Sequence, residues 1–317
     1  MADIKKIATR DAYGEALVEL GNERNDFIVM DADLAEATKT GAFKKAFPER
    51  FYDCGIAEGN MMSIAAGVAA TGKKVFASSF AMFAAGRAFE QIRNSIGYPH
   101  LNVVIGATHA GISVGEDGAT HQCCEDIALM RTIPGMTIIN PADYTEAKKA
   151  VKAAINHDGP VYMRFGRLAV PVVFDDDYSF EIGKGALLKE GTDVTIIATG
   201  LMVAEALEAY ELLKAEGISA RVINIATIKP LDTDIVLKAA KETGAIVTAE
   251  EHSVVGGLGS AVCEYLSENY PTPVVKLGVY DTYGMSGPAN DLLDKFGLRA
   301  KDIAEKAKNV IAKKRNR

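Results

Sequence analysis

The sequence predicts an α/β protein with two open sheets, each covered by helices. Short apolar runs alternate along the chain with longer stretches of helical character, an order that is typical of strand–helix–strand units. The predicted strands are apolar on both faces, as strands buried in a parallel sheet are. At 317 residues the chain is long for one compact domain, and this length favours about two.

The first series of elements runs from "FIVMD" to "VYMRF". We expect its strands at 27–31, 74–78, 102–107, 136–140 and 161–165. We expect its helices at 58–71, 82–96, 125–131 and 145–156.

A second series follows a break in composition. The stretch 171–193 is acidic, contains glycine and has weak periodicity, as linkers do. After it we expect strands at 193–200, 220–225, 245–251 and 273–279. Helices are expected at 202–216, at 233–243, after "GGLGSA", and in the lysine-rich C-terminal stretch. We therefore expect a domain of residues 1–175, a linker at 176–192 and a smaller second domain at 193–317.

Composition excludes several classes of function. The formal charge of −7 is spread along the chain, which argues against a basic nucleic-acid surface. No apolar stretch approaches the length of about 20 residues that a membrane span needs, and the N-terminal sequence lacks the apolar run of a signal peptide. We expect a cytoplasmic protein that binds neither nucleic acid nor membranes.

The four cysteines are irregularly spaced and too few for a disulfide scaffold. The vicinal pair Cys123 and Cys124 could be redox-active or bind a metal. We favour two reduced, partly buried thiols.

The stretch "GATHAGISVGEDGATHQ" begins where the strand "NVVI" ends, at the sheet edge where open parallel sheets bind ligands. It places His109, Asp117 and His121 within thirteen residues, and its glycines allow them to converge. A zinc site is one interpretation, although the spacing matches no familiar zinc pattern. A loop ordered by its own hydrogen bonds is another. We favour a polar substrate site in which the histidines donate hydrogen bonds or move protons.

Five other residues are candidates for binding. Glu58 begins a helix of small residues, where it could simply favour the helix dipole or could hold a ligand nitrogen. Phe80 and Phe83 could be core residues or a stacking surface for a planar heterocycle. Arg10 and Arg167 could be surface charges or bidentate anion contacts.

These segments resemble the C-terminal half of transketolase, in order and over nearly the whole chain. The first domain carries "ATR", "DADL", "GIAEGNM", "SSFAMF", "THAGISVGEDGATHQ" and "RFGR". The second carries "IKPLD" and "EEHSVVGGLGSAV". The most specific feature is "GEDGATHQ" with "GIAE" upstream. The resemblance implies a thiamine-diphosphate pyrimidine-binding fold followed by a transketolase C-terminal-type domain.

The same resemblance implies a transferase that uses thiamine diphosphate to move a two-carbon ketol unit from a ketose phosphate to an aldose phosphate, as in the pentose phosphate pathway. Glu58 would be catalytic, because in the family this glutamate hydrogen-bonds a nitrogen of the aminopyrimidine ring and favours its imino tautomer. Phe80 and Phe83 match the aromatic stretch that packs on the pyrimidine. Asp33 matches an acid near the cofactor and the subunit interface.

The resemblance also implies the substrate contacts. His109 and His121 would bind sugar hydroxyls and assist proton transfer, which makes them catalytic as well. Asp117 would contact the hydroxyl beside the ketose carbonyl. Arg10 and Arg167 would hold the terminal phosphate of a sugar phosphate.

Two departures from the family pattern affect these expectations. Ala37 stands where several relatives keep a phosphate-binding serine, which bears on phosphate specificity. The G-D-G…N motif that holds the cofactor's diphosphate and its metal does not occur in the sequence. We therefore expect a separate N-terminal subunit with Mg²⁺ or Ca²⁺ and no metal site in this chain. We also expect this chain to self-associate through its pyrimidine-binding and C-terminal domains, which gives an α2β2 heterotetramer.

Alternative interpretations remain open at this point. The β chain of 2-oxoacid dehydrogenases has a similar domain plan but lacks "GEDGATHQ". A specialised transketolase-like enzyme or a deoxyxylulose-phosphate-synthase-like subunit shares more of the pattern. A non-catalytic scaffold of the same fold would have no need for Glu58, His109, Asp117 and His121.

Overall fold

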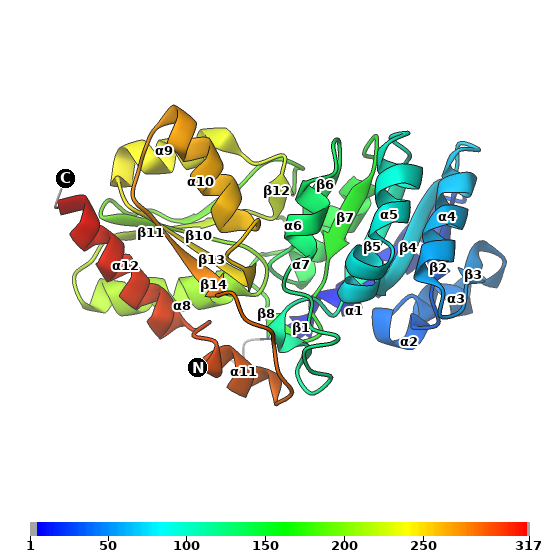
Figure 1. Cartoon of the computed structure of the whole chain (residues 1–317), viewed down its shortest axis with the longest axis horizontal. Helices are drawn as coiled ribbons and strands as arrows, with labels where there is room; N and C mark the ends of the chain where they lie inside the picture. Colours follow the sequence, from blue (N-terminus) through cyan, green and yellow to red (C-terminus); the bar gives the residue numbers. More distant parts are fainter. Residues whose placement is uncertain (1–4, 316–317) are drawn as a thin grey trace.

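The computed structural model describes residues 5–315, and its two α/β domains lie side by side along the long axis (Figure 1). The first domain contains a seven-stranded sheet of order β12-β6-β7-β5-β4-β2-β3. Its strands are β2 (Phe27–Asp31), β3 (Phe51–Asp53), β4 (Lys74–Phe80), β5 (Val103–Thr108), β6 (Thr137–Ile139), β7 (Val161–Arg164) and β12 (Thr227–Lys229). All pairs are parallel except β12 with β6.

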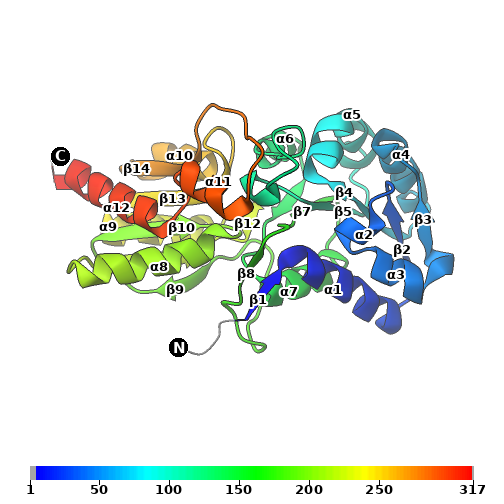
Figure 2. The same ribbon diagram turned by 90° about the horizontal axis from the view of Figure 1, so that it is seen from below.

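Helices cover both faces of this sheet (Figure 2). One face carries α1 (Thr9–Glu23), α3 (Gly41–Ala46) and α7 (Tyr144–Ala154). The other carries α4 (Glu58–Ala69), α5 (Phe89–Gln91) and α6 (Asp126–Arg131). The core on the α1 side is aromatic, with Tyr13 stacked on Phe165 at 4.7 Å between ring centroids. On the α4 side, Met61, Met62 and Ala65 pack on the sheet, and the small residues bring α4 close to it.

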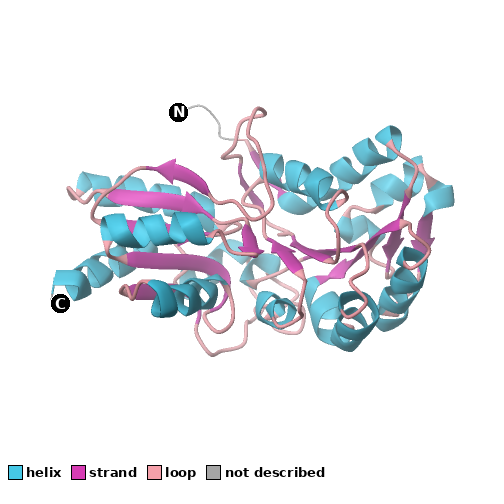
Figure 3. Cartoon of the chain, turned by 90° about the horizontal axis from the view of Figure 1, so that it is seen from above, coloured by secondary structure: helices cyan, strands magenta, loops and turns pink. Residues whose placement is uncertain are grey.

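The second domain contains a five-stranded sheet of order β14-β13-β10-β11-β9. Its strands are β9 (Ala186–Lys189), β10 (Val194–Ala198), β11 (Ala220–Asn224), β13 (Ile246–Ser253) and β14 (Val274–Val279). Helices lie on both sides of this sheet too (Figure 3). They are α8 (Met202–Ala215), α9 (Thr233–Thr243), α10 (Leu258–Asn269), α11 (Ala289–Lys295) and α12 (Ala300–Arg315). The structure thus confirms two open α/β domains.

Several elements differ from the sequence expectations. The stretch 82–96, expected to be one α-helix, forms two π-helical turns, Met82–Arg87 and Ile92–Gly97, around the short α5. Strand β4, expected at 74–78, extends to Phe80. The segment 176–192, expected to be a linker, includes β9, which pairs antiparallel with β11. β9 is short and only half-buried, so its sequence carries little strand signal.

Two further strands join segments that are distant in sequence. β1 (Lys6–Ala8) pairs with β8 (Ala169–Pro171), so the chain entering the first domain lies beside the chain leaving it. β12 comes from the second series of elements but pairs with β6 in the first sheet. The two domains are therefore joined by backbone pairing as well as by side chains.

The parallel strands β2, β4, β5 and β7 end at the same edge of the first sheet. Polar or aromatic residues stand at these ends: Asp31, Phe80, Thr108 and Arg164. This edge is where a doubly covered parallel sheet offers backbone and side chains to a ligand.

Candidate functional site

His109 directly follows β5 and has φ 56°, in the left-handed region where residues other than glycine are uncommon. Its Nε2 lies 3.0 Å from Arg10 Nη1, and a guanidinium can only donate, so Nε2 accepts. Nδ1 therefore carries the proton and donates to Thr108 Oγ1 at 2.9 Å. Burial, followed by the charge of Arg10, lowers the pKa of His109 to about 3. The ring is neutral, with a defined tautomer, at physiological pH.

Four rings form what we call the aromatic cluster: Phe80, Phe83, His109 and His121. Phe80 stacks on His109 with 3.8 Å between centroids, and Phe80 and Phe83 lie nearly parallel at 5.8 Å and 17°. His121 meets Phe83 edge-on at 5.2 Å. The structure thus brings together two histidines and two phenylalanines that the sequence places up to forty-one positions apart.

Glu58 stands at the start of α4, and only 1% of it is exposed. Its Oε2 accepts a hydrogen bond from Arg87 Nη1 at 2.9 Å. The Arg87 guanidinium also lies over the Phe83 ring, 4.6 Å from its centroid, a cation–π arrangement. Through Arg87, the Glu58 carboxylate is connected to the aromatic cluster.

Arg87 is a residue that the sequence analysis missed. Its spacing of four from Phe83 was the available signal, since residues four apart share a helix face. The π-helical turn that contains both residues is a rare form often found at functional sites.

Arg10 and Arg167 place positive charge beside His109. Arg10 Nη1 also donates to Ala37 O at 3.1 Å, while its Nε is buried and has no partner among the described residues. Burial lowers the pKa of Arg10, and the Arg167 charge lowers it further. Arg167 Nη1 contacts Val114 O and pairs with Glu116 Oε2 at 3.1 Å. A buried donor without a partner, next to a second arginine, suits an anionic group.

The loop that carries Ala37 is held by Asp31, at the end of β2. Asp31 Oδ2 accepts from Thr38 Oγ1 at 2.7 Å and Thr40 Oγ1 at 2.8 Å, and its Oδ1 accepts from the backbone N–H of Leu34 at 2.7 Å. Burial raises the pKa of Asp31 to about 6. This carboxylate fixes the backbone acceptor that Arg10 uses.

Two predicted residues, Asp33 and Asp117, stay outside the aromatic cluster. Asp33 is exposed, has φ 61°, and its backbone N–H donates to Asp53 Oδ1 at 3.0 Å. Asp117 is exposed in the glycine-rich loop between the two histidines. Within residues 5–315, neither carboxylate hydrogen-bonds to the aromatic cluster.

Comparison with known proteins accounts for both domains. Residues 5–172 match the family described as "Transketolase, pyrimidine binding domain", and residues 183–303 match "Transketolase, C-terminal domain". The chain belongs to the transketolase family.

Several proteins similar to this transketolase chain are named as separate sections or subunits of a transketolase. It is 50% identical, over 96% of both chains, to a Methanocaldococcus jannaschii protein named as a transketolase C-terminal section. It is 44% identical to the "6-deoxy-6-sulfo-D-fructose transketolase subunit SqwH" of Clostridium sp. (strain MSTE9), over 96% of this chain and 95% of that protein. A solved structure described as "Split gene transketolase, inactive beta4 tetramer" superposes with a TM-score of 0.90 at 56% identity, covering 96% of this chain and 99% of that one.

The matched pyrimidine-binding domain implies the use of thiamine diphosphate. The residues present fit its aminopyrimidine ring. Glu58 is a buried carboxylate that accepts a hydrogen bond from a planar cation, and that same cation lies over Phe83. An aminopyrimidine is likewise planar and presents N–H donors at its edge, so it suits the same two partners.

The vicinal cysteines of this transketolase chain are poor candidates for thiol chemistry. All four cysteines are free, and burial raises the pKa of Cys123 and Cys124, which disfavours the reactive thiolate.

Among the described residues, no group of three or more His, Cys, Asp or Glu side chains is arranged to hold a metal ion. Nowhere in residues 5–315 is there a helix with the length and apolar character needed to cross a membrane.

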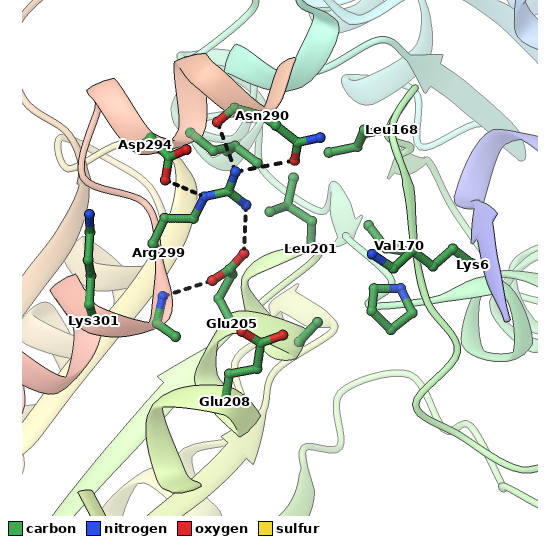
Figure 4. Close-up of a pocket in the computed structure, with 14 residues that line it drawn as sticks. Lys6, Leu168, Val170, Leu201, Glu205, Glu208, Asn290, Asp294, Arg299 and Lys301 are labelled. Atoms are coloured by element: carbon green, nitrogen blue, oxygen red, sulfur yellow. Dashed lines mark hydrogen bonds and ion pairs between the residues drawn. The ribbon is translucent and has the colours of Figure 1, made fainter. Parts of the chain in front are cut away.

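A separate cleft of about 400 Å³ lies between the two domains, bounded by β1, β8, α8, α11 and α12 (Figure 4). Arg299 lines this cleft, and its guanidinium donates hydrogen bonds to Glu205 and Asp294 at 3.0 Å and to the Asn290 carbonyl at 2.8 Å. None of the predicted site residues lines this cleft. Its polar groups tie α11 and α12 to α8.

Proposed function

We propose that this chain is the C-terminal subunit of a split, thiamine-diphosphate-dependent transketolase, which transfers a two-carbon ketol unit from a ketose phosphate to an aldose phosphate. The observation that carries the proposal is the buried Glu58 carboxylate, which Arg87 connects to Phe83 and so to the aromatic cluster that contains His109 and His121. A cofactor-holding acid and polar groups suited to a sugar thus occupy one site.

Thiamine diphosphate supplies, when bound, the thiazolium carbon on which the ketol group is carried. Glu58 would hydrogen-bond a ring nitrogen of the aminopyrimidine and favour the tautomer in which that nitrogen carries a proton. Phe83 and Phe80 would orient the ring by stacking. Arg87 would give up its hydrogen bond to Glu58 where the ring binds.

His109 and His121 face the sugar in this proposal. The Nδ1–H tautomer of His109 leaves Nε2 as an acceptor, so this atom can take a hydrogen bond or a proton from a sugar hydroxyl. His121 stands edge-on to Phe83, next to the place of the pyrimidine. Asp117, in the same loop, contacts the hydroxyl beside the ketose carbonyl once the sugar is bound.

The anionic end of the sugar binds at Arg10 and Arg167. The buried Arg10 Nε supplies the donor that lacks a partner. Ala37 has no side-chain hydroxyl that could hydrogen-bond to a phosphate, and its carbonyl already accepts a hydrogen bond from Arg10. One relative is named for a sulfonated sugar. A sulfonate is therefore the second anion to test at these arginines, after a phosphate.

A separate N-terminal subunit completes the site, holds the diphosphate through Mg²⁺ or Ca²⁺, and forms an α2β2 assembly. Relatives of the same length that are named as sections or subunits support this. The surface beside Glu58 is suited to a partner, because it exposes apolar side chains: Ile56 is 76% and Ile64 40% exposed. Asn60, Ser63 and Gly67 of α4 are exposed next to them. Asp33, whose backbone N–H donates to Asp53 Oδ1, contacts the cofactor or partner in the assembly.

The test is a ketol-transfer assay with xylulose 5-phosphate and ribose 5-phosphate, in the presence of thiamine diphosphate and Mg²⁺. The chain is assayed alone and together with an N-terminal subunit that carries the diphosphate motif. We expect transfer only from the mixture, and a stable complex by size-exclusion chromatography. Transfer by this chain alone would refute the split site. A stable complex without transfer from phosphorylated donors would redirect the substrate assignment, with 6-deoxy-6-sulfofructose as the second donor.

A further inference from the structure

We propose that Glu251, in the second domain, is a positioning residue that sets the histidine-bearing loop of the first domain. The inference rests on the proposed function for its kinetic consequence only. It goes beyond the pyrimidine-binding and substrate contacts, all of which lie in the first domain.

The first observation is direct contact between Glu251 and the loop. Glu251, near the end of β13, accepts a hydrogen bond at Oε1 from the backbone N–H of Ser113. Gly111 has φ 81° and lies against the same carboxylate: a Cβ there would stand 2.6 Å from Oε1 and 2.8 Å from Oε2. Only glycine allows this approach. Glu251 therefore holds the backbone two to four residues after His109.

The second observation concerns the other end of the loop. Gln122, next to His121, is buried, and its Nε2 donates to Ile112 O at 3.2 Å, Gly115 O at 3.0 Å and Met285 O at 2.9 Å. The first two bonds close the loop on itself. The third attaches it to the segment between β14 and α11 of the second domain.

A third contact joins both ends. Arg164, at the end of β7, donates through Nη2 to the carbonyl of Glu251 at 2.9 Å and to that of Cys123 at 3.3 Å. Its Nε pairs with Asp126 Oδ2 at 2.8 Å. Burial raises the pKa of Glu251 to about 7, and the Arg164 charge opposes that rise. The Glu251 side chain thus lies in a buried polar contact between the domains, where hydrogen bonds are strong.

The chain offers a matched control in Glu250. It is the neighbour of Glu251, is equally buried, and burial raises its pKa to about 7 as well. Its carboxylate, however, accepts from the backbone N–H groups of Leu258 and Gly259 at 2.7 and 2.8 Å, within the second domain. Glu250 stabilises the start of α10 and does not touch the histidine loop.

The experiment compares Glu251→Ala and Glu251→Gln with Glu250→Ala and Glu250→Gln in the full-length chain. The chain is labelled with ¹⁵N-histidine, and the resonances of its five histidines are assigned by single substitutions. We expect Glu251→Ala to shift or broaden the ring signals of His109 and His121. Glu250→Ala should move only His252, whose Nδ1 is 3.7 Å from Glu250 Oε2. Glu251→Gln keeps an acceptor for Ser113 and should restore most of the normal spectrum, even if Glu251→Ala folds poorly.

In the reconstituted complex, we expect Glu251→Ala to raise KM for the sugar by about 10-fold, as expected for losing one buried hydrogen bond, with the Kd of thiamine diphosphate unchanged. The proposal is overturned if His109 and His121 keep their normal signals in Glu251→Ala. It is also overturned if Glu250→Ala disturbs these signals equally. Since the spectra need no activity, a failure of the transfer assay would count against the proposed function alone.

Discussion

At the scale of single residues, His109 shows how burial and neighbouring charge set protonation. A histidine near pKa 6.5 changes its charge in the physiological range, but this ring is buried and hydrogen-bonded to a guanidinium. Both effects disfavour imidazolium. His109 is therefore a hydrogen-bond acceptor at Nε2 rather than a cation.

The first prediction concerns the titration of His109. Its pKa of about 3 lies below the ordinary value, so the ring should stay neutral as the pH is lowered from 8 to 5. The stability that this ring contributes is present above pH 6.5 and falls as the pH is lowered toward 3, because the unfolded state binds the proton first. Histidine ¹⁵N shifts would check this. A titration midpoint above pH 5.5 for His109 would contradict the arrangement with Arg10.

The second prediction concerns Glu58. We expect Glu58→Ala to reduce ketol transfer in the reconstituted complex by at least about 100-fold, in the range of removing a group that manages a catalytic proton, with the circular dichroism spectrum unchanged. His121→Ala should instead weaken sugar use more than cofactor binding. Unchanged transfer by Glu58→Ala would remove the basis for the cofactor assignment, and loss of cofactor by His121→Ala would overturn the role of that histidine.

At the scale of elements, two capping aspartates hold the chain that connects the domains. Asp143 caps α7 by accepting from Glu146 N at 2.8 Å, and its Oδ2 also accepts from the backbone N–H groups of Val173 and Phe174 at 2.6 and 2.8 Å. Asp232 caps α9 and accepts from the backbone N–H of Gly185 at 2.9 Å. Each helix N-terminus thereby anchors one end of the connecting segment.

The third prediction is that Asp143→Ala lowers the free energy of unfolding by about 2–4 kcal/mol, since it removes an N-cap and leaves buried N–H groups without an acceptor. Urea denaturation followed by circular dichroism would measure it. Asp175→Ala is the control, because Asp175 lies in the same segment and is exposed. Equal stability of the two variants would show that the connecting segment is not anchored through this cap.

At the scale of the whole molecule, a buried ion pair within the first domain holds the arginine that hydrogen-bonds to the second domain. Arg164 and Asp126 form an ion pair at 2.8 Å with side chains that are 4% and 0% exposed, and Tyr162 donates to the same carboxylate oxygen at 2.9 Å. Arg164 then reaches Glu251 in the second sheet. Arg299, by contrast, is partly exposed and links elements within the second domain.

The fourth prediction compares these two arginines. Arg164→Ala should lower the free energy of unfolding by about 3–5 kcal/mol, because it leaves Asp126 buried without its partner. Arg299→Ala should lower it by only about 1 kcal/mol, since its partners can be solvated. Urea unfolding of both variants is the measurement. Equal losses would mean that the domain interface does not depend on the buried pair.

The sequence by itself determined the fold class, the succession of the long strands and helices, and the family. Apolar runs such as β2 and β10 are buried on both faces, so local pattern is enough to predict them. The motif around His109 and His121 predicted a strand-end loop, because it is rich in glycine and polar residues and directly follows an apolar run. Local pattern did not predict β9 or β12, since short strands depend on the neighbour with which they pair.

Only the tertiary structure decided how the candidate site is assembled. The contact of Arg87 with Glu58, the tautomer of His109 and the anchoring of its loop by Glu251 all join residues that are far apart in the chain. Such contacts depend on distance, burial and local charge, which are set only when the chain folds. A sequence motif can name the residues that carry a chemistry, but their protonation and relative position are properties of the folded chain.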